Sequence, residues 1–157
     1  MRRCTRCKGE RFQRVERKLV RTVGDQLFSA PIPAERCVDC GEGYIDAKDG
    51  MRFEAVIAVE LARRGADSGE AFRYMRRHLG LRGGDLAGLL SVAPATVSRW
   101  ETGQRPVDPA AARLLGVLVI EQAAGRAETL ERLRALRRPR RTPKNIRLDL
   151  RTGRKAG

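Results

Sequence analysis

The chain has 157 residues, with 33 Lys and Arg, 19 Asp and Glu and one His, for a formal net charge of +14. This length favours one ordinary domain or two small ones, and the cationic excess favours a polyanionic partner, nucleic acid first. Four Phe, two Tyr and one Trp provide little surface for stacking single-stranded bases. The single histidine, His78, excludes a His-pair metalloenzyme and disfavours a Ser-His-Asp site. No apolar run approaches the roughly 20 residues of a membrane span, so we expect a cytoplasmic protein without a membrane partner.

The cations are concentrated at the C-terminal end of the chain. Residues 1–48 carry a net charge of +4 and residues 49–132 a net charge of +1, whereas residues 133–157 carry +9. Because 28 of the 33 cations are Arg, which a GC-rich genome favours through its codons, their distribution is more informative than their total. The dense charge and two prolines predict that residues 137–157 form a flexible basic tail. This tail either lies along DNA phosphates or only keeps the protein soluble.

All four cysteines lie in the first 40 residues, as two identical CxxC steps. A CxxC turn directs both sulfurs at one centre, and two such turns complete the tetrahedron that zinc accepts from four thiolates. We therefore predict one structural Zn²⁺ held by Cys4, Cys7, Cys37 and Cys40. A redox pair or an iron–sulfur cluster is the alternative use of these cysteines. With four protein ligands the zinc would have no open position for water, so metal catalysis is not expected.

The residues between the two cysteine pairs predict a β-ribbon. Two candidate strands, residues 17–23 and 26–28, flank a Gly-Asp turn, although apolar and polar residues alternate imperfectly. Pro31 and Pro33 are expected to end the second strand. Residues 1–48 are therefore predicted to form a small zinc-ribbon-like domain, whose core is too small to fold securely without its metal.

The next segment has the periodicity of an amphipathic helix over residues 51–64. Its predicted apolar face consists of Phe53, Val56, Ile57 and Leu61. A Gly-Ala-Asp-Ser-Gly segment rich in turn formers follows. Residues 49–69 are therefore predicted to be a connecting helix and a hinge.

From residue 70 onward the apolar pattern predicts a series of short helices. Two stripes have helical spacing, namely Phe72, Met75 and Leu79, and then Leu86, Ala87 and Leu90. After a short turn, Pro94 suits the first position of the next helix, in which Val97 and Trp100 face inward. A helix, a short turn and a second helix with small polar outer residues form a helix-turn-helix, whose second helix enters the DNA major groove by its N-terminal end.

This second helix and its surroundings supply the candidate DNA contacts. They are Arg82, Ala95, Thr96, Ser98, Arg99 and Arg105. Thr96 and Arg99 are expected to carry most of the base reading, with Arg99 at a guanine or a phosphate. These small and basic side chains are the types that double-stranded DNA requires at its groove and backbone.

Other polar residues of this region have simpler explanations. Trp100 is expected in the core rather than as a stacking platform. Glu101 is expected to pair with a nearby arginine or to cap a loop, and His78 to lie at a helix end. A solvated face is the alternative explanation for Arg76, Arg77 and Arg82.

Residues 33–42, PAERCVDCGE, together with the paired CxxC steps, resemble the YgiT-type zinc domain of MqsA-like antitoxins. Residues 86–103 are similar to the Xre-type helix-turn-helix domain that follows it in that family. The resemblance implies that the zinc domain holds a toxin and that the helix-turn-helix represses their shared operon. Two departures affect the DNA contacts. Residues 82–84 are Arg-Gly-Gly where Xre-type domains usually have Ser or Thr followed by Gln, and Pro94 and Ala95 stand where the family often has base-reading polar residues.

Residues 110–120 place apolar side chains nearly all round the predicted helix. This is more apolar surface than a four-helix domain of this size can cover. A symmetric dimer would bury the excess, and it suits the two half-sites that helix-turn-helix proteins recognise. Alternatively, residues 126–137 fold back over this helix. Residues 70–136 are thus predicted to form a DNA-binding and dimerisation domain.

Together these patterns predict a mainly α protein, with a small α/β zinc-ribbon-like N-terminal domain followed by an all-α Xre-type helix-turn-helix domain. We predict a bacterial, homodimeric, sequence-specific DNA-binding repressor, located at the nucleoid when bound to DNA. By the resemblance, it is the antitoxin of a type II toxin–antitoxin system. The alternatives are a stand-alone zinc-containing Xre-family regulator without a toxin and an RNA- or ribosome-associated zinc-ribbon protein. An enzyme is not expected, because the sequence has no nucleophile–base set.

Overall fold

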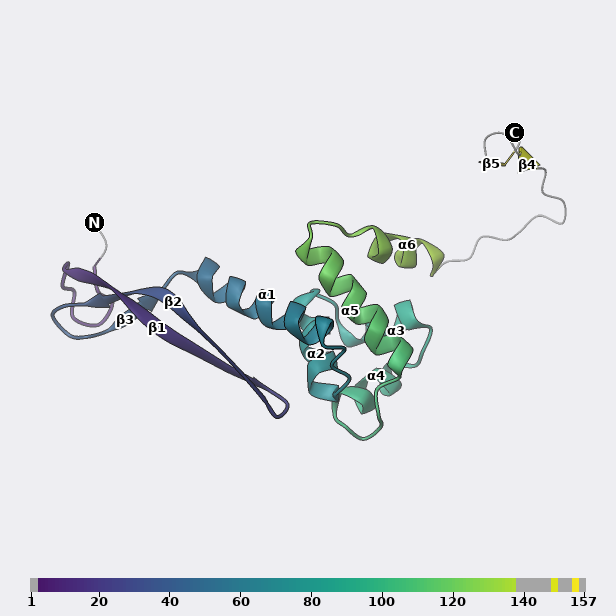
Figure 1. Cartoon of the computed structure of the whole chain (residues 1–157), viewed down its shortest axis with the longest axis horizontal. Helices are drawn as coiled ribbons and strands as arrows, with labels where there is room; N and C mark the ends of the chain where they lie inside the picture. The colour runs from purple at the N-terminus through teal and green to yellow at the C-terminus, as the bar shows by residue number, and fades with distance from the viewer. Residues whose placement is uncertain (1–2, 138–147, 150–153, 156–157) are drawn as a thin grey trace.

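A computed structural model describes residues 3–137, 148–149 and 154–155 of the protein. Over these residues it contains a three-stranded antiparallel sheet, six helices and a separate two-stranded ladder (Figure 1). The strands are β1 (Phe12–Val23), β2 (Gln26–Cys37), β3 (Gly43–Ile45), β4 (Leu148–Asp149) and β5 (Arg154–Lys155). The helices are α1 (Ala47–Arg63), α2 (Gly69–His78), α3 (Gly83–Leu90), α4 (Pro94–Glu101), α5 (Pro109–Ala123) and α6 (Glu128–Leu136). The predicted fold class, a small N-terminal β unit followed by helices, is confirmed. None of the helices in this part of the chain is both long and apolar enough to span a membrane.

β1 and β2 form a long antiparallel hairpin closed by a two-residue turn. The pairing is continuous over all 12 residues of each strand. Gly24, the first turn residue, has a φ of 61°, which is the left-handed conformation that a type II′ turn requires at this position. The predicted turn is therefore confirmed, but both strands are longer than the predicted residues 17–23 and 26–28.

The prediction that Pro31 and Pro33 end the second strand is wrong, since β2 continues through both prolines. A proline lacks the N–H group, so a strand tolerates it where that group would face an open edge. The two prolines lie two residues apart and therefore face the same edge of β2. On that edge β3 pairs only with residues 34–36, so within the described sheet neither proline removes a hydrogen bond.

The hydrogen bonds at the end of β2 show which edge this is. The Cys37 N–H donates to the Glu42 carbonyl at 2.8 Å, on the β3 side of the strand. The Val38 N–H donates to the Arg11 carbonyl at 3.0 Å, on the β1 side. Because peptide groups alternate in direction along a strand, the odd-numbered residues of β2 direct their backbone groups away from β1.

α1 begins after the N-cap Asp46, whose side chain accepts a hydrogen bond from the Lys48 N–H at 2.9 Å. Its buried face consists of Phe53, Ile57, Ala58 and Leu61. The prediction for Val56 is wrong, because this side chain is 59% exposed. At about 100° per residue, the buried face is centred between Ile57 and Leu61, and Val56 lies about 120° or more away from that centre.

α5 is covered by other helices of the same chain more fully than its sequence indicated. α1 packs along it, with the Gly116 Cα close enough that an added Cβ would lie 3.5 Å from the Ala62 carbonyl oxygen. α6 also packs on α5, and Leu130 contacts the core, as expected if residues 126–137 fold back. The expectation that a four-helix domain leaves α5 uncovered is therefore wrong, because α1, which precedes that domain, also covers α5. Val117 and Ile120 nevertheless stay exposed on α5.

The tip of the hairpin is part of the helical core. Val23 is buried in the same cluster as α1, α2 and α5, and Figure 1 shows the hairpin extending beside α1 toward α2. Glu54 of α1 accepts hydrogen bonds from Arg21 of β1 and from the Tyr74 hydroxyl of α2. Burial acts to raise the pKa of Glu54, but these two donors outweigh it and lower that pKa. The N-terminal unit is thereby joined to the helices by both apolar and charged contacts.

Most of the predicted basic tail lies outside the described residues, which resume only at β4 and β5. Arg137 is the last residue described before that gap. Its guanidinium lies beside Gly88 of α3, 2.6 Å from where a Cβ on that glycine would be. The tail therefore begins next to α3.

Gly69→Ala is expected to lower the free energy of unfolding by roughly 1–3 kcal/mol. A Cβ at position 69 would lie 2.1 Å from the Trp100 carbonyl oxygen, so α2 and the end of α4 would have to separate. Urea denaturation of this variant measures the effect. Gly83→Ala is the matched control, because no atom of the described residues lies within 4 Å of a Cβ there. A Gly69→Ala protein as stable as the wild type would contradict the close approach.

Candidate nucleic-acid interface and candidate metal centre

α3 and α4 are joined by a turn that is fixed by backbone geometry. Ser91 ends α3 in the left-handed conformation, with φ 54° and ψ 38°. The Val92 N–H donates to the Ala87 carbonyl at 3.0 Å, which closes the turn. Ala93 is the N-cap of α4, and Pro94 occupies its first turn, where the missing N–H is harmless. α3, this turn and α4 have the predicted helix-turn-helix arrangement.

α4 separates an inward from an outward face. Val97 and Trp100 are buried, and the Trp100 ring meets the Phe72 ring edge to face, with centroids 5.8 Å apart. Trp100 is thus a core residue, as predicted. Of the predicted DNA contacts on α4, the structure leaves three exposed and Thr96 half-buried. The exposed ones are Ala95, Ser98 and Arg99.

A buried ion pair holds the end of α4 against α2. The Arg76 guanidinium donates to both carboxylate oxygens of Glu101, at 2.5 and 2.9 Å, and to the Leu81 carbonyl at 2.6 Å. The expectation that Glu101 pairs with an arginine is confirmed. The alternative of a solvated face is wrong for Arg76, which is only 9% exposed. Arg76 lies four residues after the buried Phe72, so its place on the apolar stripe was the signal that sequence reasoning missed.

Arg82 lies just before α3 and is 88% exposed. Its guanidinium donates to Asp85 at 2.9 Å, and its backbone N–H donates to the same carboxylate at 3.3 Å. Asp85 thereby satisfies a free amide at the start of α3, the place where the Xre-type pattern has Ser or Thr. Asp85 neutralises part of the Arg82 charge, so Arg82 faces solvent as a partly paired cation.

Arg99 and Arg105 are both exposed, and their backbones are linked, since the Arg105 N–H donates to the Arg99 carbonyl at 3.1 Å. Within residues 3–137, neither guanidinium has an ion-pair partner. Both charges are therefore available to a phosphate or a base edge.

At the other end of the molecule the two CxxC steps adopt the same turn. In each, the amide after the second cysteine donates to the carbonyl of the first, Lys8 to Cys4 at 3.0 Å and Gly41 to Cys37 at 2.9 Å. Both Lys8 and Gly41 have positive φ, 64° and 76°. The first cysteine of each step also donates its own N–H to a carbonyl just after the turn, Cys4 to Gly9 and Cys37 to Glu42. The equal spacing thus produces two equivalent knuckles.

These knuckles bring all four predicted ligands together. The sulfurs lie within 4.8 Å of one another, with 3.5 Å between Cys4 and Cys40 and 3.6 Å between Cys7 and Cys37. No disulfide joins them, and the sulfurs are too far apart for one. In a tetrahedral zinc–thiolate site with bonds of about 2.3 Å the sulfurs are about 3.8 Å apart. The four cysteines can therefore hold a metal ion, and their donor set and spacing are consistent with zinc.

Tyr44 is a further residue of this centre that sequence reasoning missed. Its hydroxyl lies 3.2 Å from the Cys4 sulfur and accepts from the Thr5 N–H at 2.9 Å. The contact between the Tyr44 hydroxyl and the Cys4 sulfur is the largest of the causes that lower the pKa of Cys4 to about 6. The available signal was a Tyr four residues after the last cysteine, but only the return of β3 beside the first knuckle brings it to Cys4.

The other thiols show why the centre favours a cation. The Gly9 amide stabilises the Cys7 thiolate, but contacts with Cys40 and Cys37 and burial outweigh it and raise the pKa of Cys7 to about 12. The backbone hydrogen bond at Glu42 and the contact with Cys7 lower the pKa of Cys40, but burial and the contacts with Cys4 and Cys37 outweigh them, so this pKa is also raised. Four sulfurs this close cannot all ionise unless a positive charge compensates them.

Residues 69–123 match the family model described as a helix-turn-helix domain. The match spans α2 to α5 and includes the α3–α4 turn and the exposed face of α4. No curated protein matches the chain. The protein therefore carries a helix-turn-helix domain and, at its other end, a four-cysteine cluster that could hold a metal ion, which suggests a DNA-binding regulator.

Proposed function

We propose that the protein is a sequence-specific transcriptional repressor, stabilised by one Zn²⁺ and bound to operator DNA as a homodimer. We also propose that it is the antitoxin of a type II toxin–antitoxin pair. The observation that carries the first proposal is the exposed outer face of α4 on a matched helix-turn-helix domain. The second rests on the resemblance of the N-terminal unit to MqsA-like antitoxins.

The DNA contacts would lie on one side of the helical domain. The N-terminal half of α4 offers small side chains, which let the helix approach base edges closely. Thr96 would contact a base edge, and Arg99 a guanine or a phosphate. Arg82 and Arg105 would contact the DNA backbone. The small side chains of Ala95 and Ser98 would let α4 lie close to the bases. Support comes from the exposure of all of these residues except the half-buried Thr96, and from the burial of Val97 and Trp100 behind them.

The zinc would be structural. Cys4, Cys7, Cys37 and Cys40 would hold it, with Tyr44 supporting the Cys4 thiolate through its hydroxyl. When bound, the ion would cross-link the two knuckles and would leave no position for water, so it would act as a scaffold. Support comes from the four converging sulfurs and from the small core around them.

In this proposal the chain divides as its sequence predicts. Residues 1–48 form the zinc unit, 49–69 the connection, 70–136 the DNA-binding and dimerisation domain, and 137–157 the basic tail. The tail would add affinity for DNA without sequence preference, and its start beside α3 supports that role. Dimerisation would use the apolar side chains that α5 still exposes.

Arg99→Ala is expected to weaken binding to the operator about 10- to 100-fold and to relax sequence preference, since it removes one base-reading side chain. Electrophoretic mobility shifts on the native promoter and on a scrambled duplex measure both effects. Arg63→Ala, which removes an exposed arginine from the end of α1, is the matched control. An equal loss on promoter and scrambled DNA would refute base reading by Arg99.

A tagged pull-down from the native host tests the antitoxin role. Near-stoichiometric recovery of a small protein encoded by the neighbouring gene is the expected result. Recovery of the protein with DNA alone would leave a free-standing repressor and would exclude the toxin partner.

A further inference from the structure

β1 is an edge strand with a long unpaired side. The odd-numbered residues of β2 direct their backbone N–H and C=O groups away from β1. The β1 residues paired with them therefore direct their backbone groups away from β2. In the described structure those residues are Phe12, Arg14, Glu16, Lys18, Val20 and Thr22. No strand among the described residues pairs with this side of β1. At the hairpin tip, α2 packs against β1 near Val23. Farther from the tip, the outward backbone N–H and C=O groups of residues 14–20 are not covered by a strand of the described structure.

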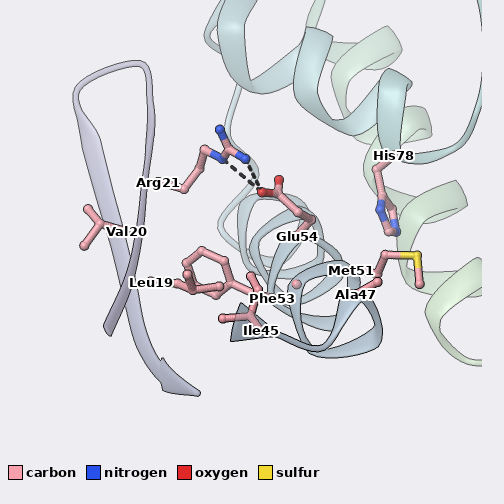
Figure 2. Close-up of a pocket in the computed structure, with 10 residues that line it drawn as sticks. Leu19, Val20, Arg21, Ile45, Ala47, Met51, Phe53, Glu54 and His78 are labelled. Atoms are coloured by element: carbon pink, nitrogen blue, oxygen red, sulfur yellow. Dashed lines mark hydrogen bonds and ion pairs between the residues drawn. The ribbon is translucent and has the colours of Figure 1, made fainter. Parts of the chain in front are cut away.

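An apolar groove runs below this open edge. Its strand side is formed by residues 19–21 of β1 together with Ile45 at the end of β3, and its floor by the start of α1. Figure 2 shows Leu19, Phe53 and Ile45 gathered under the hairpin, with Met51 and His78 at the far side and Val20 pointing away. The groove has a volume of about 560 Å³, and Met51 is 67% exposed. An added strand would direct every second side chain into this groove.

The charge of β1 decides between possible occupants. Arg14, Lys18 and Arg17 are exposed along it against the single anion Glu16. A second copy of β1 would bring together two strands that both carry an excess of positive charge, and like charges on neighbouring strands are destabilising. An acidic strand would instead face Arg14 and Lys18 with opposite charges.

We propose that the open edge of β1 and the groove below it bind an extended, acidic segment of a partner protein, which adds a strand to the sheet. Its apolar side chains enter the groove beside Leu19 and Met51, and its alternate, acidic side chains face Arg14 and Lys18. Main-chain hydrogen bonds supply affinity, and the groove and charges supply selectivity. This inference rests on the proposed partner-binding role of the zinc unit and specifies where and how the partner is held.

The test selects peptides from a displayed library of random ten-residue sequences with the full-length protein as bait. The consensus peptide is then synthesised, and its affinity is measured by fluorescence anisotropy. Lys18→Pro removes an outward N–H without touching a β1–β2 hydrogen bond, whereas Lys18→Ala removes only the charge. Met51→Glu places an anion in the groove. Leu136→Glu, at a 74% exposed position on α6, is the matched control.

The expected consensus alternates acidic and apolar residues. Lys18→Pro and Met51→Glu are expected to weaken binding about tenfold or more, Lys18→Ala about two- to threefold, and Leu136→Glu not at all. An unenriched library, a basic consensus, or peptides that bind Lys18→Pro and Met51→Glu like the wild type would overturn the inference. Promoter binding by each variant is measured in parallel and is expected to be unchanged, which shows that the helical domain is folded. A pulled-down toxin that binds Lys18→Pro normally would overturn this surface and leave the antitoxin role intact.

Discussion

Glu101→Ala is expected to lower the free energy of unfolding by about 3–5 kcal/mol, because it leaves the buried Arg76 guanidinium without its carboxylate partner. Both side chains are nine-tenths buried or nearly so. The pair also ties the end of α4 to α2 and, through the Leu81 carbonyl, to the start of α3. We therefore expect promoter binding to fall together with stability. Chemical denaturation and mobility shifts measure the two effects.

Two comparisons separate the ion pair from packing. Replacing both partners with apolar residues, Arg76→Met with Glu101→Leu, is expected to recover much of the stability, since no buried charge is left alone. Arg73→Ala is the matched control, because Arg73 approaches Glu101 only to 4.0 Å from an exposed position and should contribute less than about 1 kcal/mol. A loss under about 1 kcal/mol in Glu101→Ala would show that the pair does not secure α4.

Cys37→Ser is expected to abolish tight metal binding and to unfold the knuckle end of the N-terminal unit. Binding of zinc to four-ligand structural sites is worth about 10–16 kcal/mol in zinc-finger peptides, and much of it is lost with one ligand. The helices should stay folded, because Val23 and the Arg21–Glu54 contact anchor the hairpin tip to their core independently of the cysteines. Metal analysis and amide NMR spectra measure both parts of this expectation.

Val38→Ala is the control for this substitution, because it changes the neighbouring exposed side chain and leaves all four sulfurs in place. One metal ion per chain is expected in it and in the wild type. Unchanged amide signals for the residues around Cys4 and Tyr44 in Cys37→Ser would contradict a structural role for the metal.

The cysteine cluster and the helix-turn-helix could be predicted because their signals are local. Two CxxC steps specify two turns whatever the intervening chain does, and the 29 residues between them only have to return. In the same way, Pro94 as the first residue of a helix and the three-residue spacing of Val97 and Trp100 define the faces of α4. The two turns and the faces of α4 depend on neighbours within about one helical turn, whereas the meeting of the two CxxC turns depends on the pairing of β1 with β2.

Other features depend on partners distant in the sequence. Pro31 and Pro33 were expected to end a strand, but whether a missing N–H matters depends on which edge another strand occupies. From the sequence, Arg76 could be a solvated surface cation. In the structure it is buried because it pairs with Glu101, 25 residues later. Tyr44 contacts the four-cysteine cluster only because β3 returns beside the first knuckle.

Residue types and short spacings were enough to predict the local chemistry of this protein: four cysteines in two CxxC steps, a helix-turn-helix with a small polar outer face, and a strongly basic C-terminal end. These follow from residue type and short spacing. Only the packing of the folded chain shows that α1 covers α5, that the hairpin tip joins the helical core, and that one edge of β1 stays open above a groove. Burial of apolar surface is not directional, so which elements meet depends on the packing of the whole chain and not on any single segment.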